Sequence, residues 1–214
     1  MVHKLSLLLA KQLATYVGWQ KKTDIIAYGF ELIIGEALKF VLLLFISAYF
    51  GILMPTVLIL ATAIPLRLVS GGGHCKTYAR CTLLTVSVYF FLAVLANWLI
   101  PDFNSKTFIV ILPLLIITSF TVIHLWVPGE NPNRFFTQNE RTKFRNLSRL
   151  LILLWSAICV LFYCILSGFT FKVFFVSTAI GVGWQTFFVS PLGYWLIHSV
   201  EKLFDLFTNA KEVS

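Results

Sequence analysis

The residues best suited to chemistry lie close together between positions 67 and 81, in the segment RLVSGGGHCKTYARC. This segment holds three consecutive glycines, followed by His74, Cys75 and Cys81. A cysteine thiolate is a nucleophile, and a nearby histidine can take the proton of the thiol and later protonate a leaving amine. The segment therefore predicts a cysteine nucleophile with a histidine base, and we expect Cys81 and His74 to have these roles.

The spacing of His74 and Cys81 constrains the local structure. On one continuous helix, two residues seven apart share a face but lie about 10 Å apart along the axis, too far for a hydrogen bond. Glycines adopt backbone angles that are closed to other residues. We therefore expect His74 to lie on a loop that folds back over a helix, which begins near Lys76 and carries Cys81. Glycine N–H groups of this loop could also face a developing oxyanion.

Three other interpretations of the segment stay open. Cys75 is a competing nucleophile, although its adjacency to His74 usually points the two side chains apart. A metal site would have only three ligands here, whereas a closed structural zinc site takes four, and His124 would have to supply the fourth. The segment could also be a flexible basic loop with incidental thiols. We favour the Cys81 nucleophile and expect neither a metal nor another cofactor.

The composition indicates the class of protein that positions this segment. The 214 residues are 58% hydrophobic and only 12% charged, and a soluble fold of this size could not bury so much apolar surface. Several stretches approach the roughly 20 apolar residues that cross a bilayer as a helix. We expect an all-α, polytopic integral membrane protein that forms a single domain, residues 1–214. The net charge of +8 is then mainly a topology signal, and we expect no nucleic-acid partner.

About six membrane spans are expected, with a break near Gly51 and Pro55 dividing the first long apolar run. Their approximate bounds are 25–50, 53–68, 82–100, 107–127, 150–167 and 173–195. The first span carries Glu31, Glu36 and Lys39, and charges inside a span are functional hypotheses by default. The simpler explanation for two of them is a Glu36–Lys39 pair one helical turn apart.

Three further segments lie outside the expected spans. In the N-terminal segment, residues 1–23, leucines recur at helical spacing with Lys4 and Lys11 elsewhere on the wheel. This pattern predicts an amphipathic helix on the membrane surface, with an ordinary packed helix as the alternative. Residues 128–149 form a polar loop. In the tail, residues 199–214, charges alternate with apolar residues from Glu201 onward, which indicates another surface helix.

The distribution of basic residues predicts the orientation in the membrane. Of the 17 lysine and arginine residues, only Lys106 and Lys172 fall on the opposite side from the motif, and Lys39 lies within a span. Basic residues concentrate on the cytoplasmic side of membrane proteins. We therefore expect a multi-pass protein of the cell (plasma) membrane, with both termini, the motif and the 128–149 loop in the cytoplasm.

The pattern R-x-x-S-G-G-x-H, followed by a cysteine seven residues after the histidine, resembles the accessory gene regulator protein B (AgrB) family. Tyr28-Gly29-x-Glu31, at the start of the first span, also resembles that family. Further similar residues are Val127-Pro128 with Glu130, Asn131, Asn133 and Arg134, and Gln185 and Pro191 in the last span. Cys75 lies outside the core pattern of the family.

The resemblance implies a membrane cysteine endopeptidase that processes a quorum-sensing propeptide. Such a substrate has an amphipathic N-terminal helix, a signal segment and an acidic C-terminal tail. The enzyme removes the tail and holds the signal segment as an acyl-thioester, which a substrate cysteine or serine attacks to release a thiolactone or lactone. The resemblance makes Cys81 the nucleophile and His74 the base, supported by Arg67, Gly71 and Gly72.

Other residues of the motif are candidates for supporting the site or binding substrate, namely Ser70, Gly73, Lys76 and Arg80. Basic residues suit an acidic tail, and confinement of the substrate to the membrane raises its effective concentration at the site. Glu31 could orient His74 if the first span passes the motif. Glu36 is a weaker candidate for the same role. The expected partners are the lipid bilayer and the propeptide, with a homodimer left open.

Two competing functions belong to other classes. A transporter or exporter of a small peptide or solute would explain six spans and the charges within the first one. However, no paired halves with matching broken helices are visible, and the glycine–histidine–cysteine motif would have no role. A non-catalytic scaffold or receptor would tolerate substitution of both His74 and Cys81. Sensitivity to thiol alkylation distinguishes the peptidase from the transporter.

Overall fold

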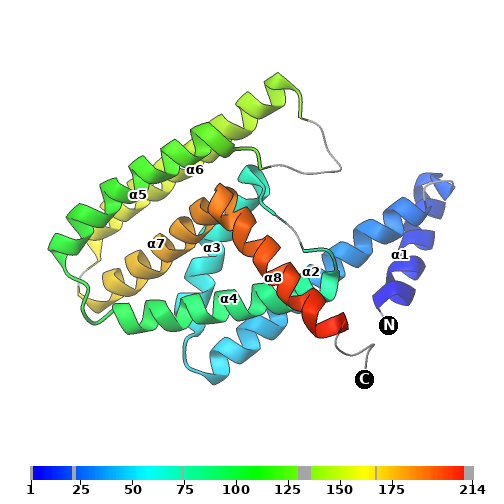
Figure 1. Ribbon diagram of the computed structural model, residues 1–214, viewed down its shortest axis with the longest axis horizontal. Helices are drawn as coiled ribbons and strands as arrows, with labels where there is room; N and C mark the ends of the chain where they lie inside the picture. The colour runs from blue at the N-terminus through cyan, green and yellow to red at the C-terminus, as the bar shows by residue number, and fades with distance from the viewer. Residues whose placement is uncertain (1, 21–22, 74, 130–135, 167, 210–214) are drawn as a thin grey trace. The chain divides into compact units, whose positions relative to one another are not determined.

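The computed structural model describes residues 2–20, 23–73, 75–129, 136–166 and 168–209. All regular secondary structure in these residues is helical, in eight helices labelled α1 to α8 (Figure 1). Six of the described helices, α2 to α7, are long and apolar enough to cross a membrane. The predicted all-α, polytopic membrane architecture with six spans is therefore confirmed. The described chain divides into two compact units, residues 1–49 and 50–214.

The first unit is a pair of helices, α1 (Val2–Val17) and α2 (Thr23–Tyr49), packed against each other. The buried residues of α1 recur every four positions and are small: Ser6, Ala10 and Ala14. Small residues let two helices approach closely in a membrane. The larger apolar residues of α1 are exposed: Leu5, Leu8, Leu13 and Tyr16. The predicted N-terminal helix is present, and three of its leucines, Leu5, Leu8 and Leu13, are exposed.

The charged residues near the middle of α2 form an ion pair. The Lys39 ammonium group donates a hydrogen bond to a Glu36 carboxylate oxygen, with Nζ 2.6 Å from Oε1. Only 2% of the Lys39 side chain is exposed. A buried charge is tolerated when it is paired and hydrogen-bonded. The predicted pair one turn apart is therefore present, and it accounts for these two charges without a transport function.

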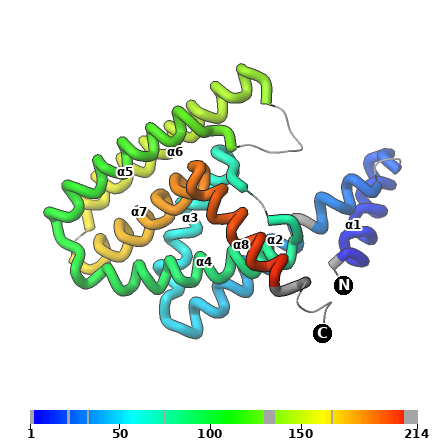
Figure 2. Tube along the Cα trace, in the orientation of Figure 1, coloured from blue at the N-terminus to red at the C-terminus, as the bar shows by residue number. Residues whose placement is uncertain are grey.

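The second unit is built around α7. It contains α3 (Leu53–Ser70), α4 (Tyr78–Leu99), α5 (Ser105–Trp126), α6 (Gln138–Ile165), α7 (Phe169–Val189) and α8 (Pro191–Asn209). Helix α7 contacts all five of the others and is the most buried of the six spans. Figure 2 shows α7 between α5 and α6 on one side and α3 and α4 on the other. A side chain on α7 can therefore contact the segments at the ends of several neighbouring helices.

Helix α7 is fixed at two levels along its length. Near its start, Phe175 is fully buried, and its ring lies 4.9 Å from that of Phe108 and 5.1 Å from that of Phe103, between ring centroids. Further along, Gly181 lies against α3, where a Cβ atom would be only 2.7 Å from the backbone oxygen of Ile59. The absence of a side chain at Gly181 therefore lets α3 and α7 pack closely.

The last span ends earlier than predicted. The expected span 173–195 is wrong at its end, because α7 stops at Val189 and α8 begins at Pro191. Proline forces the preceding residue out of the helical region and suits the first position of a new helix. Ser190 accordingly has extended backbone angles, φ −74° and ψ 162°. The predicted surface helix of the tail therefore begins at Pro191, ten residues before Glu201.

The predicted loop 128–149 is only partly a loop. Helix α6 begins at Gln138, so it includes the second half of this range as well as most of the expected span 150–167. Its start is fixed by a capping box, in which the Glu140 carboxylate accepts a hydrogen bond from the Thr137 backbone N–H at 2.9 Å. In return, the Thr137 hydroxyl accepts from the Glu140 N–H at 3.3 Å. The Thr-x-x-Glu pattern is the sequence signal for this start.

We predict that Gly181→Ala destabilises the protein and that Gly183→Ala does not. A Cβ at Gly181 would lie 2.2 Å from the Thr62 hydroxyl oxygen as well as close to the α3 backbone, whereas one at Gly183 meets only a Leu115 methyl at 3.6 Å. Overpacking of this kind costs about 1–3 kcal/mol. Thermal unfolding of both variants in detergent measures the difference. An unchanged melting temperature for Gly181→Ala would contradict this account of the α3–α7 contact.

Candidate active site

The glycine loop, residues 70–73, leaves the end of α3 with a backbone that requires glycine. Gly71 has φ +76° and Gly72 has φ +143°, a region that is strained for residues with a side chain. The Gly71 N–H donates to the Arg67 carbonyl oxygen at 2.9 Å and closes the helix. This N–H group is therefore already paired and is not free to face an oxyanion.

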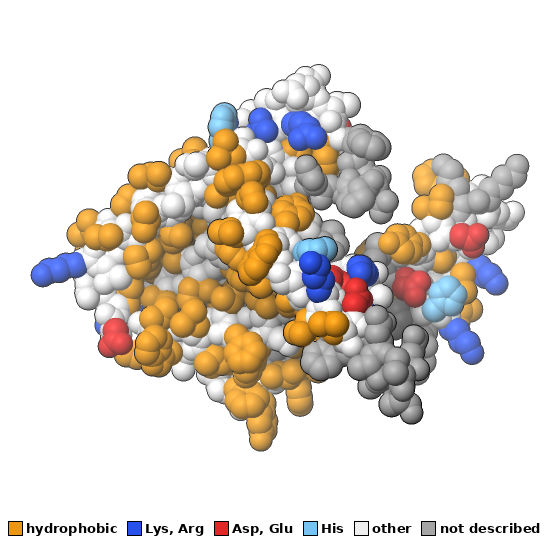
Figure 3. Space-filling model, in the orientation of Figure 1, with side chains coloured by type: hydrophobic (Ala, Val, Ile, Leu, Met, Phe, Trp, Pro, Cys, Tyr) orange, Lys and Arg blue, Asp and Glu red, His pale blue; other side chains and the backbone are white. Residues whose placement is uncertain are grey.

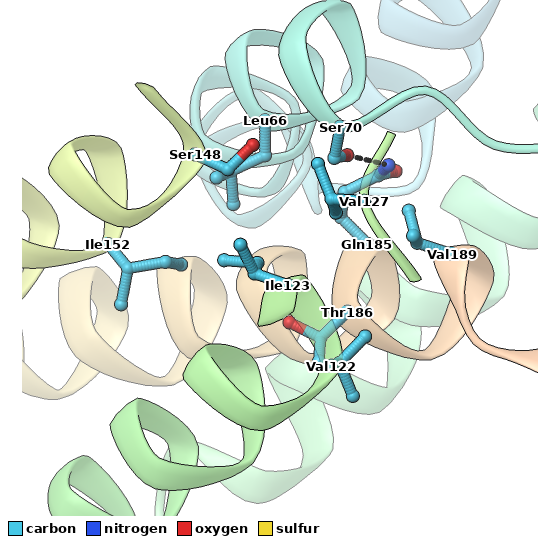
Figure 4. A pocket seen from close by; sticks show the side chains of 10 residues that line it. All are labelled: Leu66, Ser70, Val122, Ile123, Val127, Ser148, Ile152, Gln185, Thr186 and Val189. Carbon is cyan, nitrogen blue, oxygen red and sulfur yellow. Dashed lines mark hydrogen bonds between the residues drawn. The ribbon is translucent and has the colours of Figure 1, made fainter. Parts of the chain in front are cut away.

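Gln185 of α7 holds the glycine loop from inside the unit. Its side-chain nitrogen donates to the Ser70 hydroxyl and to the Gly71 carbonyl oxygen, each at 2.9 Å. Figure 4 shows the side chain of Gln185 pointing toward Ser70. Only 2% of Gln185 and 4% of Ser70 is exposed. Because both groups are buried, these bonds satisfy polar atoms that would otherwise be costly to bury.

Arg67, in the last turn of α3, holds the far end of the glycine loop. Its guanidinium group donates to the Gly73 carbonyl oxygen, with Nη2 3.1 Å from the oxygen. The same group lies over the Phe188 ring of α7, 4.6 Å from the ring centroid, which is a cation–π contact. The structure thus brings together five predicted support residues: Arg67, Ser70, Gly71, Gly72 and Gly73.

A second loop, directly after α5, docks onto the first. The Gly129 N–H donates to the Ser70 carbonyl oxygen at 2.8 Å, and Arg145 of α6 donates to the Val127 carbonyl oxygen at 2.7 Å. A Cβ on Gly129 would lie 2.8 Å from the Gly72 nitrogen, so the two backbones are in close contact. Glu130, Asn131, Asn133 and Arg134, which contributed to the family resemblance, lie outside the described residues.

A small cavity lies behind the glycine loop. Its lining includes Ser70, Val127, Ser148 and Gln185 (Figure 4), and its volume is about 10 Å³. That is about the room that one water molecule needs. The cavity is too small for a peptide, so it belongs to the packing that supports the loop.

Cys81 lies in the first turn of α4. The helix begins at Tyr78, two residues later than predicted, and the Thr77 side chain caps it by accepting from the Arg80 N–H at 3.4 Å. The Cys75 thiol, on the loop, lies near that of Cys81. Both cysteines are half-buried. His74 lies outside the described residues, so the predicted pairing of His74 with Cys81 stays a prediction.

Helix α8 contributes two acidic residues that the sequence analysis did not identify as part of the site. Asp205 accepts from the Lys76 ammonium group at 2.7 Å and from Arg80 Nη1 at 2.6 Å. Glu201 accepts from the same Arg80 nitrogen at 2.7 Å. Figure 3 shows acidic and basic side chains meeting over α8. The basic residues expected to attract an acidic tail are therefore already paired with carboxylates of the chain itself.

The environment of Cys75 disfavours its thiolate. Burial, the neighbouring Cys81 and the Glu201 carboxylate raise the pKa of Cys75 to about 12. Because only the thiolate is strongly nucleophilic, Cys75 is a poor nucleophile at neutral pH. The low nucleophilicity of Cys75 is an argument for Cys81 as the nucleophile, which the residues alone did not supply.

The remaining sequence candidates make other contacts. Glu31 Oε2 lies 3.4 Å from His3 Nδ1 within the first unit, and its proposed contact with His74 involves a residue outside the described ranges. His124 lies in the last turn of α5, with Nδ1 2.9 Å from Arg149 Nη2. In the part of the chain that the structure describes, no group of three His, Cys, Asp or Glu side chains is arranged to hold a metal ion.

We predict that Gln185→Leu loosens the glycine loop, because the substitution removes both hydrogen bonds at once. Leaving buried polar groups unpaired costs about 1–3 kcal/mol, so amide exchange across residues 70–73 should become about tenfold faster or more. Thr186→Val is the matched control, since Thr186 is hydrogen-bonded to Ser119 and not to the loop. Hydrogen–deuterium exchange with mass spectrometry measures both. Unchanged exchange in Gln185→Leu would mean that other contacts position the loop.

Comparison with known proteins identifies the family. The sequence profile of the Accessory gene regulator B family matches residues 6–189. Two AgrB-like proteins of Clostridium perfringens, from strains SM101 and 13, are each 24% identical over 98% of this chain and 99% of their own length. An AgrB-like protein of Clostridium beijerinckii is 30% identical over 64% of each chain. No solved structure matches the chain. The chain belongs to the Accessory gene regulator B family, which acts in the processing of quorum-sensing peptides.

Proposed function

We propose that the protein is a membrane-embedded cysteine endopeptidase that removes the C-terminal tail of an autoinducer propeptide. The observation that carries the proposal is the position of Cys81, in the first turn of α4 after a glycine loop that Arg67 and Gln185 fix in place. The first turn of a helix favours negative charge. A thiolate at Cys81 would therefore lie on a rigid helix, at the last position of the family motif.

The proposed reaction begins when His74 takes the proton of the Cys81 thiol. The sulfur attacks the carbonyl carbon at the boundary between the signal segment and the tail, and a tetrahedral intermediate forms. His74 then protonates the leaving amine, so the C–N bond breaks and the tail departs. The signal segment remains bound to Cys81 as a thioester. A cysteine or serine within that segment attacks the thioester carbonyl, which regenerates Cys81 and releases a thiolactone or lactone.

The substrate is proposed to approach along the membrane surface. An amphipathic helix of the propeptide would lie at the interface, near the start of α4, which carries Cys81. Lys76 is the most accessible cation of the motif, with 63% of its side chain exposed, although it already pairs with Asp205. An acidic tail would therefore compete with α8 for Lys76. Glu31 as the carboxylate that orients His74 stays a prediction.

The nucleophile assignment predicts that Cys81→Ala and His74→Ala abolish cleavage of the propeptide while the substrate still binds. Cys81→Ser should be nearly inactive, because a hydroxyl is a far weaker nucleophile than a thiolate without strong base assistance. Cys75→Ala should keep most of the activity, because the Cys75 thiol stays protonated. Cleavage of purified propeptide in liposomes, followed by mass spectrometry, measures all four variants.

The covalent intermediate provides a second test of the same assignment. Incubation of the protein with propeptide should give an adduct that hydroxylamine removes and that maps to Cys81. An adduct on Cys75, or full cleavage by Cys81→Ala, would show that Cys81 is not the nucleophile. Activity that survives complete thiol alkylation would contradict the cysteine endopeptidase itself and favour transport or scaffolding.

The proposed orientation places the motif in the cytoplasm and the α4–α5 connection outside. We predict that Asp102→Cys is labelled by a membrane-impermeant thiol reagent in intact cells, and that Asn139→Cys is labelled only after permeabilisation. Both positions are exposed, and both variants carry serine at the four native cysteines. Labelling reports on the side of the membrane and needs no activity. The reverse pattern would invert the topology.

A further inference from the structure

Glu201 is the only buried acidic residue in the described part of the chain, with 4% of the residue exposed. It lies on α8 but faces the motif. One carboxylate oxygen accepts from the Lys76 backbone N–H at 3.0 Å, and the other accepts from Arg80 Nη1 at 2.7 Å. Cys75 directly precedes Lys76, so this carboxylate also lies next to Cys75. Glu201 thus ties together Lys76 and Arg80, beside Cys75, in the segment between the glycine loop and Cys81.

The Glu201 carboxylate is ionised at neutral pH. Burial by itself would raise the pKa of Glu201, but the hydrogen bonds from Arg80, the Lys76 amide and the Cys75 thiol lower it below its usual value. Burying a charge is costly unless it is paired and hydrogen-bonded, and each of these donors provides such compensation. The site therefore contains a fixed negative charge next to one of its two thiols.

A fixed negative charge acts on Cys75 in two ways. The thiol can donate to the carboxylate only while it keeps its proton, and a thiolate formed in its place would be repelled by a like charge. Burial contributes most to the raised pKa of Cys75, followed by the neighbouring Cys81 and then by the Glu201 carboxylate. Asp205, one turn further along α8, binds the Lys76 and Arg80 side chains. It is not among the groups that act on the Cys75 thiol.

We propose that Glu201 is a positioning residue that selects between the two thiols: its fixed charge keeps the Cys75 thiol protonated and leaves Cys81 as the nucleophile. Glu201 contacts no reacting atom and acts only through its neighbours. The inference rests on the proposed function for the role of Cys81. The effect of Glu201 on Cys75 can be measured without any substrate.

The test compares alkylation rates of individual cysteines in the full-length protein in detergent. Iodoacetamide is added at pH 8.5, and peptide mass spectrometry gives the rate at each position. In the wild type, Cys81 should react faster than Cys75. In Glu201→Gln, Cys75 should react about tenfold faster than in the wild type, since each pKa unit changes the thiolate fraction tenfold. Asp205→Asn, the matched control, should leave the Cys75 rate within about twofold of the wild type.

Cys159, which is fully buried in α6, is the control that distinguishes loss of folding from loss of the charge. A folded variant keeps Cys159 unreactive. Glu201→Met is a second neutral variant, in which Arg80 keeps its ion pair with Asp205. It should raise the Cys75 rate as Glu201→Gln does.

A third measurement uses the wild type alone: the Cys75 rate should keep rising between pH 8 and pH 10 without a plateau.

Several outcomes would overturn the inference. They are equal rates at Cys75 and Cys81 in the wild type, a plateau of the Cys75 rate below pH 10, and an equal rise in Asp205→Asn. An unchanged Cys75 rate in a folded Glu201→Gln or Glu201→Met protein would also overturn it. These results are independent of the proposed function, which fails instead if Cys81→Ala still cleaves the propeptide.

Discussion

Gln185 donates from one amide nitrogen to both the Ser70 hydroxyl and the Gly71 carbonyl oxygen. These two bonds matter because the glycine loop leaves α3 among apolar helices, where an unpaired polar group is expensive. Gln185 belongs to α7, the helix that contacts every other helix of its unit. The position of the loop is therefore tied to the most buried element of that unit, and the start of α4, with Cys81, follows a few residues later.

The sequence predicts the spans well because their signal is local. Length and apolar composition are enough to predict six spans, and helical spacing is enough to predict α1. Hydropathy does not indicate the start of α6 or the end of α7, so both differ from the prediction. They depend on the capping box at Thr137 and on the backbone restriction before Pro191. Both signals are present in the sequence, but they lie in segments whose average polarity indicated a loop or a continuing span.

The candidate site was predictable only where its residues are close in sequence. Arg67 and the three glycines belong to one motif, so their association follows from the chain itself. Glu201 and Asp205 lie more than 120 residues away from Lys76 and Arg80. Their spacing of four places both on one helix face, but it does not indicate which basic residues that face meets. Only the packing of α8 decides this pairing, and it places two carboxylates where the sequence indicated a basic surface.

The turn between α7 and α8 connects these observations. Pro191 starts α8 directly after Ser190, and Gly193 lies so close to the end of α7 that a Cβ there would be 2.5 Å from the Phe188 carbonyl oxygen. This tight reversal leads α8 over the glycine loop, where Gly73 leaves room for Ile197. The loop is therefore held by Gln185 of α7 on one side and covered by α8 on the other. Because the same turn sets both contacts, it also fixes the distance from Glu201 to Cys75, and the charge beside that thiol depends on the geometry of the α7–α8 connection.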